Sequence, residues 1–272
     1  VSGEDEIARL QADFNAMAGD LEHTLHALQT ERDRVSALMH AQRQLVAGVS
    51  HELRTPVATM RGYLEAALHS QAQAPAALQA DLAVIERETL RLQSLIDDLF
   101  TLARAETQTL TMRCVPSDIG LLSRQIVATL APLAWQRSRI EVVAEIEPDL
   151  PLALVDAARW EQILHNLLHN AVRHTPPGGI VAVRAHSAGD ELIVEVRDTG
   201  SGITAGDMPH IFERFYRGAG APTGDGAGLG LALVKELLEA MGGRIQVDSA
   251  PGKGTCFMLH VPRASPSLPQ PS

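Results

Sequence analysis

The segment VSHELRTP (49–56) places a histidine beside a glutamate, with a threonine and a proline shortly after them. Each residue of a helix advances about 100°, so the side chain of His51 points away from the apolar side chains two positions before and after it and is exposed. Thr55 lies one turn further along the same face. A neutral imidazole is a good nucleophile, and the carboxylate of Glu52 can orient it and take its proton. His–Glu pairs are also common on ordinary helix surfaces, so this segment alone leaves both interpretations open.

A proline inside a helix is costly, and Pro56 stands four positions after Glu52. It removes the amide proton that would bond to the Glu52 carbonyl, and its ring crowds that carbonyl. The expected consequence is a bend or a loosening of the helix beside His51.

Three glycine-containing segments have the residue types of a nucleotide site: DTGSGI (198–203), TGDGAGLGLALVKELL (223–238) and GKGT (252–255). Asp198 can accept a hydrogen bond from an exocyclic amine, and the glycines after it allow close approach of a flat ligand. The alternating glycines of the second segment lead straight into a helix, which suits a polyphosphate. No GK[ST] ends that segment and no strand precedes it, so it is neither a P-loop nor a Rossmann fingerprint.

Two asparagines share one helix face in EQILHNLLHNAVRHTPPGG (161–179), because Asn166 and Asn170 are four positions apart. Amide oxygens together with phosphates suit Mg²⁺, and Arg173 can pair with phosphate. The histidine directly before each asparagine has the same spacing, which invites a zinc interpretation. The glutamate of H-E-x-x-H is absent and no third ligand stands nearby, so the sequence favours magnesium over zinc.

The first 106 residues are rich in Ala, Leu, Gln, Glu and Arg, all good helix formers. Apolar residues recur every three or four positions over 45–67 and again over 78–99, on either side of the segment 70–77 with its proline. This pattern predicts two long helices joined as a helical hairpin. One hairpin cannot cover its own apolar stripe, so two chains are expected to pair into a four-helix bundle.

After Arg113 the pattern changes to strand-like segments alternating with helical ones, which predicts a mixed α/β domain of about 150 residues. The expected strands are 140–147, 179–187, 191–198, 243–249 and 255–261, and the expected helices are 118–136, 156–174 and 229–241. A tail rich in Pro and Ser follows Arg263 and is expected to be disordered.

Composition narrows the function classes. The chain has 272 residues, of which 45% are hydrophobic, so about two globular domains are expected. A net charge of −10 argues against a nucleic-acid binder. The sequence contains no run of 18 apolar residues, the length that would predict a membrane span. A chain that opens on Val1 is expected to be a piece of a longer protein. Cys114 and Cys256 stand far apart without a CxxC spacing, which favours a reducing, cytoplasmic setting.

Six motifs occur in one order: VSHELRTP, NLLHNAVRHT, DTGSGI, FERFYRG (212–218), GDGAGLGLAL and GKGT. Their order and spacing resemble the bacterial sensor histidine kinases, and the resemblance covers residues 40–262. The opening GEDEIARLQADFNAMAGDLE (3–22) resembles the second half of a HAMP signalling domain.

The resemblance implies a multi-domain α and α+β fold, in which a long helical hairpin forms a dimeric four-helix bundle and a GHKL-type α/β sandwich follows. The implied segments are the C-terminal part of a HAMP-like signalling helix (1–25), a helical linker or coiled coil (26–44), a dimerisation and histidine-phosphotransfer domain (45–108), a catalytic ATP-binding domain (112–263) and a disordered tail (264–272).

The resemblance also implies roles for individual residues. His51 is the expected phospho-acceptor, Glu52 the general base and Thr55 the residue that acts in dephosphorylating the partner. Asn170 is the expected Mg²⁺ ligand and Asp198 the partner of the adenine amine. The full set of residues implied in binding ATP is Asn166, Asn170, Arg173, His174, Asp198, Gly200, Gly202, Ile203, Arg217, Gly226, Gly228, Leu229, Gly230 and Thr255. The aromatic residues Phe212, Phe215 and Tyr216 are expected to hold the glycine-rich lid over the nucleotide.

The activity implied is that of an ATP- and Mg²⁺-dependent protein-histidine kinase of a two-component system. It passes a phosphoryl group from His51 to an aspartate on the receiver domain of a response regulator, and it dephosphorylates that regulator. The chain is then the cytoplasmic portion of a homodimeric protein anchored in a bacterial inner membrane. Two alternatives stay open: a GHKL-type nucleotide-binding module that only senses or scaffolds, and a purely helical interaction protein. An intact His51–Glu52 pair together with Asn170 favours the kinase over the first, and the glycine loops argue against the second.

Overall fold

The computed structural model describes residues 2–69, 75–106, 111–218 and 227–264. The chain divides into two compact units, 1–54 and 55–272, and α1 (Ser2–His69) contributes residues to both. The expected disordered tail lies outside the described residues except for Ala264.

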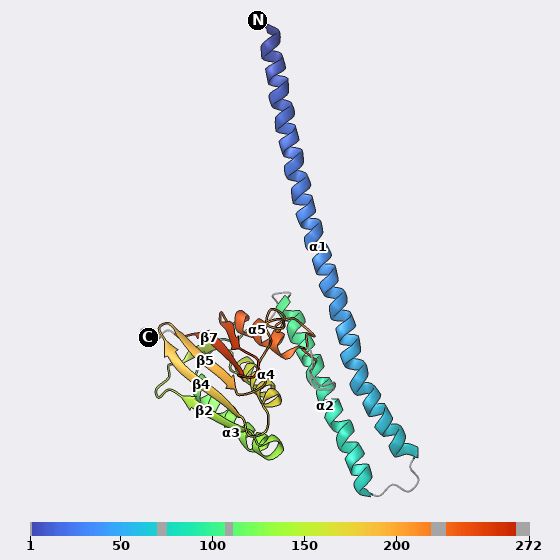
Figure 1. The fold of residues 1–272 in the computed structure, drawn as a ribbon, viewed down its shortest axis with the longest axis vertical. Helices are drawn as coiled ribbons and strands as arrows, with labels where there is room; N and C mark the ends of the chain where they lie inside the picture. Colours follow the sequence, from blue (N-terminus) through green and yellow to red (C-terminus); the bar gives the residue numbers. More distant parts are fainter. Residues whose placement is uncertain (1, 70–74, 107–110, 219–226, 265–272) are drawn as a thin grey trace, which may run out of the picture. The chain divides into compact units, whose positions relative to one another are not determined.

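The two long helices predicted from the apolar spacing are confirmed as α1 and α2 (Pro75–Glu106), drawn in blue and green in Figure 1. The loop between them was expected to reach residue 77, but α2 already begins at Pro75. A proline is favourable in the first turn of a helix. Helix α1 continues through Pro56, so the proline does not end the helix, and the bend beside His51 stays a prediction. Among the described residues, no helix combines the length and the apolarity needed to cross a bilayer.

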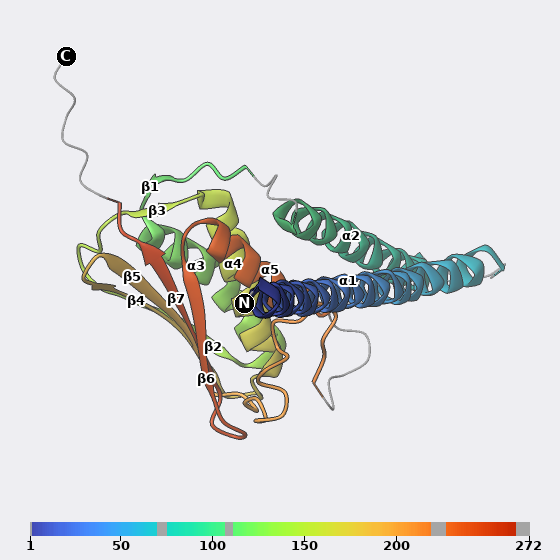
Figure 2. The same ribbon diagram turned by 90° about the horizontal axis from the view of Figure 1, so that it is seen from above.

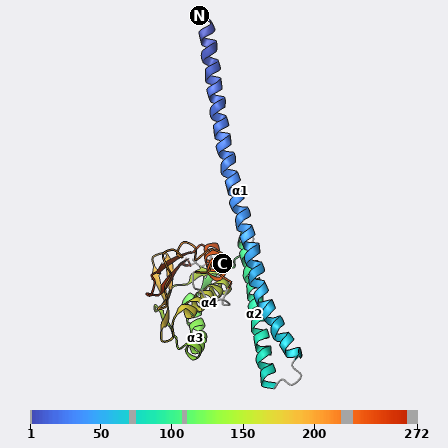
Figure 3. The same ribbon diagram turned by 45° about the vertical axis from the view of Figure 1, so that its right-hand side comes forward.

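The predicted α/β region is a two-layer sandwich. Its five-stranded sheet has the order β2-β4-β5-β7-β6, in which only the β2–β4 pair is parallel. Figure 2 shows α3, α4 and α5 together on one face of this sheet, and α3 and α4 lie on the same face in Figure 3. The elements are α3 (Ile119–Ser138), β2 (Glu141–Ile146), α4 (Ala157–His174), β4 (Ile180–Ala188), β5 (Glu191–Asp198), α5 (Gly230–Ala240), β6 (Arg244–Ser249) and β7 (Thr255–Pro262). All eight begin and end within two residues of the predicted bounds, and the predicted fold class of a helical region followed by an α/β sandwich is confirmed.

The core of the sandwich lies between the helices and the sheet. Helix α4 buries one apolar face, which includes Trp160, Leu164 and Leu168, all fully buried. Residues of β5 alternate between this core and the outer face, so Val194 is buried and its neighbours are partly exposed. This packing fixes the end of α4 beside the end of β5, where Asp198 stands.

A second sheet was not predicted. Strand β1 (Val115–Ser117) pairs antiparallel with β3 (Ala153–Val155). Strands of three residues are too short to carry a period-two pattern, so no periodicity marked them. Asp156 directly after β3 caps α4, because its side chain accepts a hydrogen bond from the Arg159 amide at 3.3 Å.

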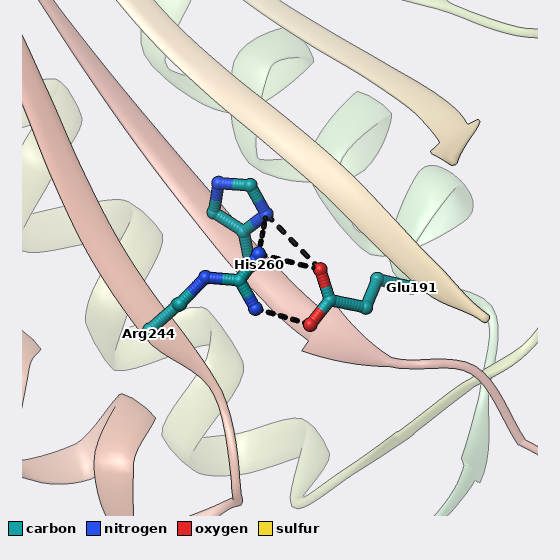
Figure 4. A network of polar contacts seen from close by, with 3 residues as sticks. All are labelled: Glu191, Arg244 and His260. Atoms are coloured by element: carbon teal, nitrogen blue, oxygen red, sulfur yellow. Dashed lines mark hydrogen bonds and ion pairs between the residues drawn. The ribbon is translucent and has the colours of Figure 1, made fainter. Parts of the chain in front are cut away.

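One polar cluster joins three strands of the main sheet at the end away from Asp198 (Figure 4). Arg244 on β6 donates to both carboxylate oxygens of Glu191 on β5, and its Nη2 lies 2.8 Å from Oε2. The Nδ1 atom of His260 on β7 lies 3.0 Å from the same Nη2. The hydrogen bond from Arg244 holds the pKa of the Glu191 carboxyl below its usual range. The cluster therefore ties together β5, β7 and β6.

Candidate active site

His51 is exposed on α1, as predicted, with 77% of its side chain accessible to solvent. The Oε1 atom of Glu52 lies 3.6 Å from His51 Nδ1, which is within ion-pair range but longer than a hydrogen bond. Only 13% of the Glu52 side chain is accessible. The carboxylate therefore stands beside Nδ1 and leaves Nε2 as the second nitrogen of the imidazole. Thr55 is exposed as well and belongs to the second compact unit.

Asp198 ends β5 and is buried, although it is a carboxylate. Its Oδ1 atom accepts hydrogen bonds from the backbone amides of Gly200, at 2.8 Å, and Thr255, at 3.2 Å. Burial raises the pKa of the Asp198 carboxyl, and the two amide hydrogen bonds partly oppose that rise. The structure thus brings the DTGSGI and GKGT segments together around one carboxylate.

The loop after Asp198 is held by backbone contacts that leave no room for side chains. Gly202 has a φ of +70°, and a Cβ there would overlap the carbonyl oxygen of Ala250. The next amide, that of Ile203, donates to Ser249 Oγ at 2.9 Å. Ser249 Oγ also lies 2.9 Å from the Gly254 carbonyl oxygen and 2.9 Å from Thr255 Oγ1. Sequence reasoning missed Ser249, because no local motif marks a serine whose role is to join two distant loops.

The C-terminal end of α4 borders the same loop. The carbonyl oxygen of His174 accepts a hydrogen bond from the Ser201 amide at 3.2 Å. Burial lowers the pKa of the His174 imidazole, and the neighbouring Arg173 charge lowers it further. His174 therefore stands beside the predicted adenine site as a neutral ring. The structure leaves the predicted contacts of Arg173 and Arg217 with phosphate as predictions.

Asn166 and Asn170 lie one turn apart on the same face of α4, and both are partly buried. Asn166 Nδ2 donates to the Gln162 carbonyl at 2.9 Å, which fixes the orientation of the amide. Its Oδ1 atom faces the first residue of α5, because a Cβ on Gly230 would lie 2.7 Å from it. An oriented amide oxygen beside a helix N-terminus is a suitable ligand for a cation that is bound to phosphates.

The residues before α5 pack against the FERFYRG segment. Phe215 donates its amide to the Gly228 carbonyl at 2.9 Å. Gly228 has a φ of +68°, and a Cβ there would lie 2.7 Å from the Tyr216 carbonyl oxygen. Leu229 is buried, and Lys235 Nζ lies 6.0 Å from the centre of the Phe212 ring. The aromatic segment therefore touches the start of α5, and the predicted site residue Gly226 lies outside the described residues.

Two family models match the chain. The model of the His Kinase A (phospho-acceptor) domain matches residues 41–108. The model of the histidine kinase-, DNA gyrase B- and HSP90-like ATPase matches residues 155–265. The first range contains His51 and Glu52, and the second contains the buried Asp198 and both α4 asparagines.

Several known proteins resemble this chain in sequence or in fold. The sensor histidine kinase TmoS of Ectopseudomonas mendocina is 34% identical over 89% of this chain and 25% of its own length. A crystal structure of full-length ShkA in complex with AMPPNP is 32% identical with a TM-score of 0.62, over 84% of this chain and 47% of that one. Histidine kinase ThkA in complex with the response regulator protein TrrA has a TM-score of 0.64 over 86% of this chain and 64% of that one. At 20% identity this likeness concerns the fold alone. The chain spans half or less of the length of the curated relatives it matches.

Proposed function

Because this chain belongs to the sensor histidine kinases of two-component systems, we propose that it is an ATP-dependent protein-histidine kinase. It phosphorylates its own His51 and passes the phosphoryl group to an aspartate of a response regulator. It also dephosphorylates that regulator, with Thr55 acting in this step. The proposal rests on the occurrence of two features in one chain. One is an exposed histidine beside a carboxylate, and the other is a buried aspartate at a glycine-lined site.

His51 is the nucleophile of the proposed reaction. Glu52 stands beside Nδ1, so Nε2 is the nitrogen that we assign to the attack. The Nε2–phosphorus bond forms as the bond between the γ-phosphorus and the bridging oxygen of ADP breaks, and the imidazole proton passes to Glu52. Exposure of His51 suits this role, because the same nitrogen must next meet the receiver domain of a second protein.

The adenine end of ATP is assigned to Asp198. Both backbone amides bond to its Oδ1, so Oδ2 is the oxygen that we assign to the exocyclic amine. Gly200, Gly202 and Ile203 are assigned to the adenine site as well, and His174 borders it as a neutral ring.

The phosphate end of ATP is assigned to the neighbouring residues of α4 and the start of α5. Asn170 and the oriented Asn166 amide would hold Mg²⁺, and Gly228, Leu229 and Gly230 would offer backbone to the phosphates. Mg²⁺ supplies neutralisation of phosphate charge when it is bound. Arg173 and Arg217 are further candidates for phosphate contact, and Gly226 belongs to the same proposed set.

Labelling with γ-labelled ATP and Mg²⁺ tests this function. We expect the chain to take up label that is stable to base and labile to acid, as a phosphohistidine is, and His51→Ala to abolish it. His26→Ala is the matched control, since it removes another exposed histidine of α1 and should leave the label unchanged. Equal labelling of wild type and His51→Ala, or nucleotide binding without any labelling, would contradict the kinase assignment.

The partners follow from the same family membership. A second copy of this chain would pair through the helical hairpin (45–108), and the receiver domain of a response regulator would dock near His51. The catalytic domain is assigned to 112–263. The HAMP-like stretch at 1–25 and the linker at 26–44 support the proposal that the full-length protein is anchored in a bacterial inner membrane, with this chain on its cytoplasmic side.

A further inference from the structure

Phe215 adopts a backbone conformation that is unusual for a bulky side chain. Its φ is +61°, in the left-handed region. Such a residue keeps this conformation only where its surroundings impose it, and it frequently marks a functional position. Here the Phe215 amide donates to the Gly228 carbonyl, and Gly228 is itself left-handed. These two residues therefore meet directly before α5.

The next residue is held from the other side. Tyr216 Oη donates to Asp207 Oδ1 at 2.7 Å. Thr204 Oγ1 donates to the second oxygen, Oδ2, at 2.8 Å, and the Thr204 carbonyl accepts the Asp207 amide at 3.1 Å. Both oxygens of one carboxylate are thus engaged. These hydrogen bonds hold the pKa of Asp207 below its usual range, with Tyr216 as the largest cause, so the carboxylate is ionised at neutral pH.

A chain of contacts runs from this carboxylate to the proposed phosphate site. Asp207 holds Tyr216, the Tyr216 carbonyl faces Gly228, and the helix that begins two residues later places Gly230 against Asn166 Oδ1. At Gly228 the nearest atoms all belong to the backbone of Phe215 and Tyr216, so only a hydrogen fits at its Cα. A shift of the Tyr216 backbone is therefore passed to Gly228, two residues before α5 begins, rather than absorbed by a flexible side chain.

We propose that Asp207 is a positioning residue for ATP, which acts through Tyr216 to place Gly228 and the N-terminus of α5 beside Asn166. This inference deepens the proposed function and rests on it. Asp207 is not among the residues that we assign to contact with the nucleotide or with His51. Its carboxylate and the Tyr216 hydroxyl lie at a partly exposed place outside the core, where a hydrogen bond contributes modestly to global stability. The loss of their bond should therefore appear in ATP affinity before it appears in folding.

Three variants separate this role from a general structural one. Tyr216→Phe removes the donor and keeps the ring. Asp207→Ala removes the acceptor, and Asp207→Asn keeps an oxygen that can accept the same bond without its charge. Asp149→Asn is the control, because Asp149 is exposed, outside the site and left-handed, a conformation that asparagine tolerates.

The readouts are the KM for ATP and the maximal rate of His51 labelling. We expect Asp207→Ala and Tyr216→Phe each to raise the KM about three- to ten-fold, with the maximal rate and the thermal midpoint near those of wild type. The double variant should be no worse than Asp207→Ala, since Asp207→Ala already removes the bond that Tyr216→Phe removes. Asp207→Asn should recover part of the loss, and Asp149→Asn should match wild type.

An unchanged KM in both single variants would overturn the inference, and so would a lower thermal midpoint with an unchanged KM. Additive effects in the double variant would also overturn it, because they would place the two residues in separate roles. Failure of the proposed function would give a different result from failure of this inference. In that case the wild-type chain itself would take up no acid-labile label.

Discussion

At the scale of single residues, the surroundings of Asp198 limit what this side chain can bind. It is a carboxylate buried at the end of a strand, with one oxygen committed to two backbone amides. Burial of a charged group is unfavourable unless hydrogen bonds compensate for it. The raised pKa of Asp198 shows that its charged form is disfavoured by burial. A ligand amine that completes the hydrogen bonding of the carboxylate would recover part of this cost, which is why we assign it to adenine.

The variant Asp198→Asn tests this assignment. Its amide oxygen can still accept from Gly200 and Thr255, so the fold should survive, but its NH₂ group would oppose the adenine amine. We expect the affinity for ATP to fall about ten-fold or more, the usual scale for losing a hydrogen bond to a charged group. The affinity for inosine triphosphate, which has a carbonyl in place of the amine, should fall much less. Titration calorimetry with both nucleotides measures the change in preference.

The control for this variant is Asp248→Asn, which makes the same chemical change at an exposed position of β6. Equal losses of affinity for ATP and for inosine triphosphate in Asp198→Asn would show that the carboxylate supports the loop rather than reading the base.

At the scale of elements, the C-terminal half of α2 packs against the helices of the sandwich. Leu95 and Leu102 of α2 are buried, and α2 lies against α5. Asp98, between them, accepts a hydrogen bond from Gln162 Nε2 of α4 at 3.3 Å. Burial raises the pKa of Asp98 to about 6, and the neighbouring Asp97 charge adds to the rise. A carboxylate at this contact makes the packing of two helices dependent on pH.

The sign of this dependence follows from the shift. The folded-state pKa of about 6 exceeds the ordinary value of 3.8, so the folded chain binds the proton more tightly than the unfolded chain does. The contribution of Asp98 to stability is therefore complete below pH 3.8 and is lost as the pH rises through about 6. We expect Asp98→Asn to raise the thermal midpoint at pH 7.5 and to change it little at pH 4.5, as measured by calorimetry.

Glu86→Gln is the control for this pair of measurements, because Glu86 is an exposed carboxylate of the same helix. If Asp98→Asn raised the thermal midpoint equally at both pH values, the gain would not come from the ionisation of Asp98. That result would contradict the prediction.

At the scale of the whole molecule, the hairpin leaves large apolar side chains uncovered. Among the residues of α1 and α2 in the second unit, about half of the surface of Val57, Leu64, Leu82 and Leu90 is accessible to solvent. Full burial of an exposed leucine is favourable by roughly 1.5–3 kcal/mol, so covering the exposed half of each side chain contributes about half of that. A second copy of the hairpin is the partner that would cover such a stripe along two helices.

We therefore expect the chain to sediment as a dimer and Leu64→Arg/Leu82→Arg to sediment as a monomer. The affinity of the double variant for ATP should equal that of wild type, because the residues assigned to binding ATP all lie outside the hairpin. Leu121→Arg is the matched control, since Leu121 is a similarly exposed leucine of α3. A double variant that stays dimeric in analytical ultracentrifugation would place the dimer contact elsewhere.

The sequence by itself determined the local structure and the type of chemistry. The apolar spacing of the helices and the alternation of the strands are local patterns, so α4, β5 and α5 were predicted to within one residue at each end. The exposure of His51 also followed from angular arithmetic on one helix. Asp198, Asn166 and Asn170 could be chosen because their functional groups match adenine and magnesium.

Only the tertiary structure decided which distant residues meet. The bonds from Thr255 to Asp198 and from Ser249 to the Ile203 amide join segments that no periodicity relates. The left-handed Phe215 and the hydrogen bond from Tyr216 to Asp207 were equally invisible, because these residue types carry no sign of an unusual backbone angle or of a distant partner. Contacts of this kind depend on how the helices and the sheet pack, and packing is a property of the whole domain rather than of any short segment.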